Sequence, residues 1–185
     1  MSLRFAILAA LLDGEASGYD LAKRFDVSVA NFWSTTPQQL YRELDRMHVD
    51  ELIAAEIVEQ SKRPNKRVFA LTRAGRDALQ EFSAQPTRPV VIRDELLVKV
   101  QALNASAPQD VHKSLVERAA LAKQKLDRYQ RLRSRLLDGR TEEEHLRTTE
   151  NLGPYLTLMG GIALERESLA WAEDARRILA ARYDL

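Results

Sequence analysis

The sequence contains no cysteine among its 185 residues. Disulfide bonds and thiolate metal sites are therefore excluded, and a cytoplasmic location is favoured. Long apolar runs are also missing: the longest, residues 5–12, covers about two helical turns, whereas a membrane span needs roughly 20 apolar residues. The first 14 residues lack the charged start and small-residue cleavage site of a signal peptide. We therefore expect no membrane contact and no cleaved leader.

Residue patterns of known catalytic sites are absent as well. No G-x-S-x-G, glycine-rich phosphate loop or H-E-x-x-H occurs, and the histidines His48, His112 and His145 are far apart in the chain. Glu142 and His145 form a single E-x-x-H pair, whereas carboxylate di-metal sites need a second pair and further glutamates on facing helices. We interpret residues 142–144 as acidic residues that stabilise a helix start. The sequence thus predicts no enzyme, no metal site and no cofactor.

The net charge is +1, but basic residues cluster in one segment. Between residues 60 and 76 there is no acidic residue and there are six basic ones: Lys62, Arg63, Lys66, Arg67, Arg73 and Arg76. Such a cluster in a near-neutral chain is typical of a local contact with a polyanion. It is equally typical of a solvated turn with scattered cations, and charge alone does not separate the two.

Apolar residues at helical spacing predict three helices in the first 49 residues. The first starts near Leu3 and ends at Asp13–Gly14, and the second, capped by Ser17, runs from 18 to about 27. Thr36 and the proline after it predict the start of a third helix, 36–49. The expected core positions of the third helix are Leu40, Leu44 and Met47.

A hairpin and a fourth helix follow in the pattern. Strands are predicted at 57–61 and 67–71, joined by a turn at Pro64–Asn65, and Thr72 caps a helix over 73–82. The order helix, helix, helix, hairpin, helix describes a winged helix-turn-helix domain. We assign it to residues 1–85.

The remaining residues, 86–185, predict only helices. Two prolines within 85–89 indicate a linker, and helices are expected over 90–103, from Ser106 or Pro108 to Leu137, from Thr141, and from Gly153–Pro154 to about Tyr183. A heptad-like seam lies along the second of these: Leu115, Ala119, Ala122, Leu126, Tyr129, Arg133 and Leu136. Adjacent glycines at 160 and 161 cost about 2 kcal/mol relative to alanines, which a closely approaching partner helix would offset. The chain is thus predicted to be mainly α, with a C-terminal helical dimerisation domain.

Several segments of the chain resemble the PadR family of transcriptional regulators. Over residues 1–83 the resemblance is carried by ILAALLDGEASGYDLAKRF, Trp33, TPQQLYRELDRM and RVFALTRAG. The later RDELLVKVQAL and long helices resemble the larger-tailed branch of that family. The resemblance implies a homodimeric winged-helix protein, usually a repressor, that a small molecule often releases from DNA.

One position departs from the family pattern. Glu51 stands where the family usually has glycine before the Leu-Ile that starts the wing. A left-handed backbone there costs a non-glycine residue about 1 kcal/mol or more. We expect either that Asp50 adopts this conformation or that the third helix continues further before the turn.

These observations define a candidate DNA-binding surface on helix 36–49 and wing 57–71. The third helix would read bases in the major groove and the wing would contact the backbone or minor groove. The expected DNA-binding residues are Thr35, Thr36, Gln38, Gln39, Tyr41, Arg42, Lys62, Arg63, Asn65, Lys66 and Arg67. The expected partners are double-stranded DNA carrying a pseudo-palindromic operator and a second copy of the chain.

Two further hypotheses remain. A small-molecule effector would bind an aromatic pocket made by Phe5, Trp33, Tyr155 and Trp171, although aromatic residues at helical spacing are more often part of a core. Alternatively, the protein is a helical protein–protein interaction module that uses the winged-helix fold without DNA. The concentration of cations in the hairpin favours DNA over this alternative.

Overall fold

The protein is described by a computed structural model that covers residues 3–25, 35–59, 65–87, 89 and 91–185. The chain divides into two compact units, Met1–Arg88 and Pro89–Leu185. Within the described residues, no helix combines the length and the apolar character that a bilayer crossing requires.

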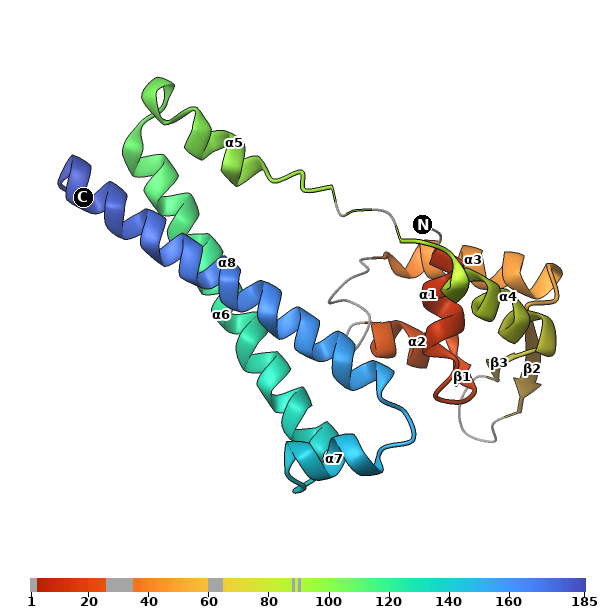
Figure 1. The fold of residues 1–185 in the computed structure, drawn as a ribbon. Coiled ribbons are helices and arrows are strands. Elements are labelled where there is room, and N and C mark those ends of the chain that lie inside the picture. The colour runs from red at the N-terminus through yellow and green to blue at the C-terminus, as the bar shows by residue number, and fades with distance from the viewer. Residues whose placement is uncertain (1–2, 26–34, 60–64, 88, 90) are drawn as a thin grey trace. The chain divides into compact units, whose positions relative to one another are not determined.

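The first unit is a winged helix-turn-helix domain, as the sequence predicts (Figure 1). Its elements are α1 (Leu3–Ala10), β1 (Ala16–Ser17), α2 (Gly18–Arg24), α3 (Pro37–Val49), β2 (Ile53–Val58), β3 (Lys66–Leu71) and α4 (Arg73–Ala84). The core forms where α1, α2 and α3 meet the sheet, around Ile7, Leu21 and Leu44, which are fully buried.

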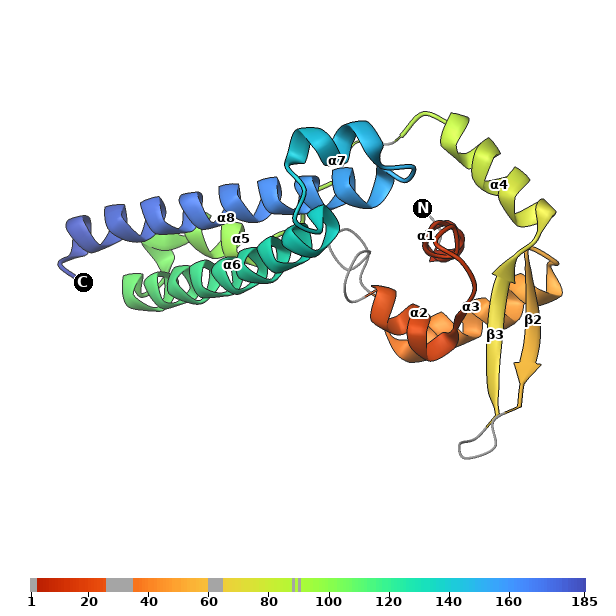
Figure 2. The same ribbon diagram turned by 90° about the horizontal axis from the view of Figure 1, so that it is seen from below.

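The sheet has three antiparallel strands in the order β1-β3-β2, one more than the predicted hairpin. The additional strand, β1, pairs Ala16 with Phe69, and two residues are too few to show strand alternation in a sequence. Figure 2 shows β2 and β3 side by side, extending away from the helices of this unit. The predicted turn residue Pro64 lies outside the described residues.

The prediction of the first wing strand over 57–61 was wrong, because β2 begins at Ile53. Ile53 is buried in the core opposite Leu71, and the register continues to Val58 opposite Lys66. Only the first residue of β2 is buried and most of the later ones are exposed although several are apolar, so the sequence shows little alternation.

The second unit consists of helices, and its centre is an antiparallel pair of long helices, α6 and α8 (Figure 1). Its elements are α5 (Glu95–Gln101), a 3₁₀ turn (Leu103–Ala105), α6 (Pro108–Leu137), α7 (Glu142–Thr148) and α8 (Gly153–Tyr183). The seam predicted for α6 is confirmed, since Leu115, Ala122 and Tyr129 are buried. One cluster packs Leu115 with Ala172 and a second packs Tyr129 with Ile162.

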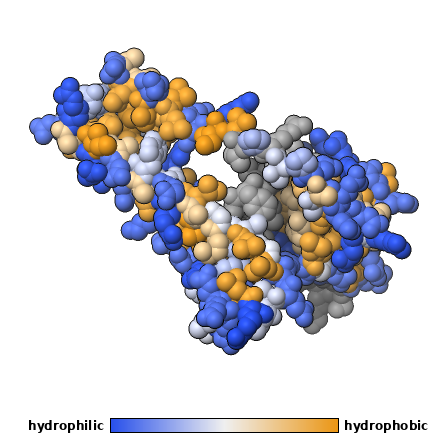
Figure 3. All heavy atoms as spheres, viewed as in Figure 1, coloured by the Kyte–Doolittle hydropathy of each residue, from blue (hydrophilic) through white to orange (hydrophobic). Residues whose placement is uncertain are grey.

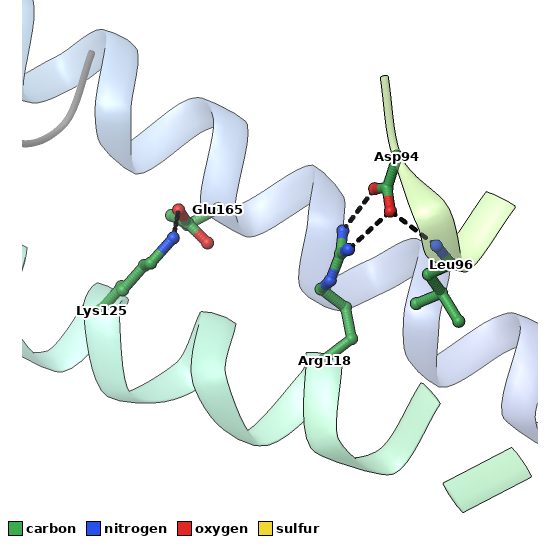
Figure 4. A network of polar contacts seen from close by, with 5 residues as sticks. All are labelled: Asp94, Leu96, Arg118, Lys125 and Glu165. Carbon is green, nitrogen blue, oxygen red and sulfur yellow. Dashed lines mark hydrogen bonds and ion pairs between the residues drawn. The ribbon is translucent and has the colours of Figure 1, made fainter. Parts of the chain in front are cut away.

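Polar contacts join α5 and α8 to α6 (Figure 4). Arg118 on α6 donates two hydrogen bonds to the Asp94 carboxylate, at 2.8 and 2.9 Å, and the same carboxylate accepts from the Leu96 N–H. Lys125 Nζ on α6 lies 2.6 Å from Glu165 Oε1 on α8. Asp94 therefore caps α5, which begins at Glu95 and not at residue 90 as predicted.

The Asp94 pair predicts an acid-dependent stability. The hydrogen bonds from Arg118 hold the pKa of Asp94 below its ordinary value of 3.8. The stabilisation is therefore present above about pH 3.8 and is lost as the pH falls through the lower, folded value. Asp94→Asn keeps a capping side chain but loses the charge, so we expect a loss of about 2 kcal/mol at pH 7. In urea unfolding, the gap between wild type and variant should close below pH 3.8.

A matched control for this prediction is Asp127→Asn, at an exposed position on α6. This variant should unfold like wild type, within about 0.5 kcal/mol. A gap between Asp94→Asn and wild type that stays constant down to pH 2.5 would contradict the charge-based account.

Candidate nucleic-acid interface

Helix α3 begins with a complete capping box. The Thr36 hydroxyl accepts the Gln39 N–H at 3.2 Å, and the Gln39 side-chain oxygen accepts the Thr36 N–H at 3.0 Å. The Thr35 hydroxyl also lies 3.5 Å from the same Gln39 oxygen. Two orphan backbone donors at the helix start are thereby satisfied. Gln39, which the sequence suggests as a base-reading residue, thus has its acceptor atom occupied by the cap.

The outward face of α3 presents polar side chains. Leu40, Leu44 and Met47 are fully buried, which turns Gln38 and Arg42 to solvent. Neither the Gln38 nor the Arg42 side chain makes a hydrogen bond or ion pair with any residue in the described ranges. Their donors and acceptors are therefore free for an external partner.

Tyr41 is held in place by a glycine. Its side chain is 47% exposed, and its ring lies so close to Gly18 that a Cβ on Gly18 would fall 2.3 Å from Tyr41 Cε1. The Gly18–Tyr19 start of α2 thus leaves space for a ring from α3. The ring is anchored while part of the side chain faces solvent. This contact joins residues that are far apart in the sequence and was not foreseen.

The wing residues have different environments. Lys66 and Asn65 are exposed at the start of β3, whereas Lys62 and Arg63 lie outside the described residues. The pKa of Asp20 is lowered, first by a hydrogen bond from Ser17 and also by the charge of Lys66, so α2 and the wing share one electrostatic environment. Arg67 is already paired: its Nη1 lies 2.6 Å from Oδ1 of Asp45 on α3.

The base of the wing is fixed to the end of α3 and the start of α4. The Thr72 hydroxyl donates to the carbonyls of Glu51 and Leu52, at 2.8 and 2.9 Å, and accepts the Gly75 N–H at 3.0 Å. A Cβ on Gly75 would lie 2.2 Å from the Leu52 oxygen. The Leu-Thr-x-x-Gly segment, 71–75, thus fixes where the wing joins the helices.

The expectations for Glu51 were wrong. Asp50 has φ −76° and caps α3, which ends at Val49, while Glu51 itself adopts the left-handed conformation with φ 59°. The reason is the hydrogen bonding around the turn, in which Leu52 N–H donates to Met47 O and Thr72 bonds the Glu51 carbonyl. Glu51 therefore adopts a backbone conformation that glycine tolerates best.

This turn predicts a stabilising substitution. Glu51→Gly removes the steric cost of the left-handed backbone and keeps the carbonyl that Thr72 binds, so we expect a gain of about 1 kcal/mol. For a domain of this size that corresponds to a rise in Tm of about 4–8 °C in a thermal melt. The matched control is Asp50→Gly. In the wild type, Asp50 has an ordinary φ, and its Oδ2 lies 3.0 Å from Arg4 Nη2. The control should lower Tm, and a rise in both variants would contradict the account.

Of the residues suggested for the effector pocket, Phe5 belongs to the first unit and Tyr155 and Trp171 belong to the second. Phe5 stacks on Phe82 in the first unit, with ring centroids 4.1 Å apart. Tyr155 and Trp171 both lie on α8, but 16 positions apart, or about 24 Å along a helix. Trp33 lies outside the described residues.

Tyr155 instead belongs to a polar cluster. Its hydroxyl donates to Glu142 at 2.5 Å and accepts from Arg133 at 3.2 Å, and its ring lies 5.1 Å from that of the buried His145. The pKa of Glu142 is lowered, chiefly by the Tyr155 hydrogen bond and also by Arg133, while burial raises the pKa of Tyr155. In the described part of the chain, no group of three or more His, Asp or Glu side chains could hold a metal ion.

The first unit is therefore a winged helix-turn-helix domain with a polar face on α3, and the second is a separate helical unit. Family models match both parts: the PadR-like transcriptional regulator family over residues 7–81, and the virulence activator alpha C-terminal family over residues 92–180. The chain belongs to the PadR-like family of transcriptional regulators.

Individual relatives match nearly the whole chain. The probable transcriptional regulator Rv1176c of Mycobacterium tuberculosis is 30% identical over 195 residues, covering 97% of this chain and 98% of the relative. The crystal structure of Bacillus subtilis PadR in complex with operator DNA has a TM-score of 0.78 at 24% identity, covering 96% of this chain and 98% of that one. The Vibrio cholerae virulence activator AphA has a TM-score of 0.73 at 27% identity, with 98% and 99% covered.

Proposed function

We propose that this protein is a homodimeric repressor that binds a pseudo-palindromic operator. Residues 1–85 bind DNA through α3 and the wing, and residues 86–185 pair two copies. The observation that carries the proposal is the exposed polar face of α3, on which Gln38 and Arg42 have no partner among the described residues. The family is one of transcriptional regulators, and the related Bacillus subtilis PadR has been crystallised in complex with operator DNA.

The proposed contacts divide into base readers and backbone contacts. Gln38 suits an adenine edge and Arg42 suits guanine or a phosphate, because both are exposed and unengaged. Tyr41, anchored on Gly18, offers its hydroxyl to a phosphate. Thr35, Thr36 and Gln39 form the helix start that approaches the backbone, and the wing supplies Lys62, Arg63, Asn65 and Lys66. Arg67 also belongs to the wing but is paired with Asp45.

A second apolar face on α8 supports the dimer. Leu156, Leu164 and Ile178 are 57%, 69% and 60% exposed although α6 covers the opposite side of the same helix. Leu156, Gly160 and Leu164 follow one another four positions apart, and nothing lies within 4 Å of a Cβ added at Gly160. Ile178 lies on the same side of α8 about four turns further on, beyond the exposed Glu167 and Asp174. Apolar side chains are gathered along the visible side of the helical unit in Figure 3. A helix of a second copy would bury this face and approach closely at Gly160.

We extend the proposal to a small-molecule effector that releases the DNA. Bacillus subtilis PadR has also been crystallised with p-coumaric acid. In this chain Tyr155 and Trp171 are too far apart on α8 for a single small pocket, so an effector site would include one of them at most.

The experiment that tests the proposal is a binding titration on the DNA immediately upstream of the protein's own gene. Fluorescence anisotropy at 50, 100 and 200 mM salt should show tight binding and a negative salt slope, with weaker binding to a scrambled duplex. Failure to prefer the upstream duplex over the scrambled one would count against an operator there. Absence of any DNA binding at 50 mM salt would favour the alternative, a protein–protein interaction module.

Two substitutions separate the proposed roles. Lys66→Ala should weaken binding to both duplexes and flatten the salt slope by about one, because Lys66 is assigned to a phosphate. Arg42→Ala should cost the upstream duplex about 1–3 kcal/mol more than the scrambled one if it reads a base. Equal losses on both duplexes would reassign Arg42 to the backbone.

A further inference from the structure

Asp45 lies on the DNA-facing side of α3, a position where a negative charge opposes DNA binding. It is three residues after Arg42 and four after Tyr41, so all three share one helix face. Its side chain is 65% exposed. A carboxylate on a surface that contacts phosphates is repelled by them, so Asp45 by itself would weaken DNA binding.

Asp45 is paired with a cation of the wing. Arg67, the second residue of β3, places Nη1 2.6 Å from Asp45 Oδ1, and its guanidinium carbon lies 5.0 Å from the centre of the Phe69 ring. The Arg67 side chain is 40% exposed, and exposed ion pairs contribute little to folding stability. What the pair does accomplish is to tie a wing cation to the recognition helix across 22 positions of sequence.

We propose that Asp45 is a positioning residue that withholds Arg67 from the phosphate backbone and so lowers the protein's affinity for DNA of any sequence. This inference rests on the proposed DNA-binding function. Because each cation that neutralises a phosphate adds about 0.9 to the salt slope, an Arg67 held by Asp45 adds nothing. Lys66, the residue next to it, is exposed and contributes its full charge.

A low affinity for DNA of any sequence is useful to a regulator, because the many non-operator sites of a genome compete with the operator for the protein. With Arg67 held on α3, the wing is positioned relative to the recognition helix and supplies one fewer non-selective contact. Removal of the Asp45 charge should therefore increase binding to random DNA, an effect opposite in sign to the removal of Lys66 or Arg42.

The test is a salt series on a random-sequence 30-bp duplex with the full-length protein. Asp45→Asn should steepen the slope of log K against log salt by about one, so that its advantage over wild type grows about 3.5-fold between 200 and 50 mM salt. Asp45→Glu, which keeps the charge, should retain the wild-type slope. In the Arg67→Ala background, Asp45→Asn should change the slope by less than half as much.

A matched control is Asp77→Asn on α4, which has the same charge change at an exposed position and loses only a 4.0 Å pair with Arg73. It should leave the slope unchanged, and circular dichroism should show all variants folded. Two results would overturn the inference and leave the proposed function standing, provided that wild type binds DNA. In the first, Asp45→Asn has the wild-type salt slope; in the second, Asp45→Asn steepens the slope equally in the Arg67→Ala background. If wild type binds no duplex at 50 mM salt, the proposed function itself fails, and the inference with it.

Discussion

Leu164→Glu is expected to convert the protein from a dimer to a monomer and to reduce its operator affinity by at least about 100-fold. Leu164 is 69% exposed on the free face of α8, so the substitution leaves the packing of the monomer intact. In the proposed dimer it would place a charge in an apolar helix–helix contact, at a large desolvation cost. Two linked recognition units gain roughly 10²–10⁴ in avidity over one, and a monomer loses that gain.

Sedimentation equilibrium and anisotropy on the upstream duplex measure the two effects separately. The control is Leu146→Glu, an exposed leucine on α7 that lies off the α8 face and should leave both readouts unchanged. A Leu164→Glu protein that sediments as wild type and binds DNA as wild type would exclude this face of α8 as the dimer contact.

Gly75→Ala is expected to destabilise the winged-helix unit by about 3 kcal/mol, because the added methyl group has no room. The Cβ would lie 2.2 Å from the Leu52 oxygen and 3.0 Å from Leu71 Cδ2, and a backbone carbonyl cannot rotate away as a side chain can. The same carbonyl accepts hydrogen bonds from Thr72, so a shift of Leu52 would also disturb the cap of α4. Thermal melts should show Tm lowered by roughly 12–24 °C for this unit.

Gly153→Ala is the matched control for Gly75→Ala. Gly153 is the first residue of α8, and the nearest atom to an added Cβ is Asn151 Oδ1 at an ordinary 3.6 Å. The variant should melt at the wild-type temperature or slightly above it, since alanine favours a helix over glycine. If Gly75→Ala melted like Gly153→Ala, the close approach of α4 to Leu52 could not be what fixes the wing.

The two neighbouring glutamines show how far a sequence can distinguish functional residues. Gln38 and Gln39 are both exposed at the start of α3, and both suit an adenine edge. The structure separates them, because Gln39 closes the capping box with Thr36 while Gln38 makes no such bond. The T-x-x-Q spacing of 36–39 was itself a readable signal, since a glutamine at the third helical position commonly caps.

The ends of elements show a different limit. Thr36, Thr72 and Thr141 all cap the helices that the sequence assigns to them, because a cap depends on residues three positions apart. The start of β2 at Ile53 depends instead on Leu71, 18 residues away, and Asp94, the cap of α5, is held by Arg118, 24 residues away. No local pattern contains those partners.

By itself, the sequence determined the mainly helical class, the winged-helix order, the α6 seam and the absence of disulfides, because these follow from composition, periodicity and caps within a few residues. Only the tertiary structure decided that Gly18 supports Tyr41, that Gly75 meets Leu52, that Glu51 takes the left-handed turn, and that Asp45 holds Arg67. Each of these depends on two segments meeting in space, and the geometry of such a contact is set by the packing of the whole unit.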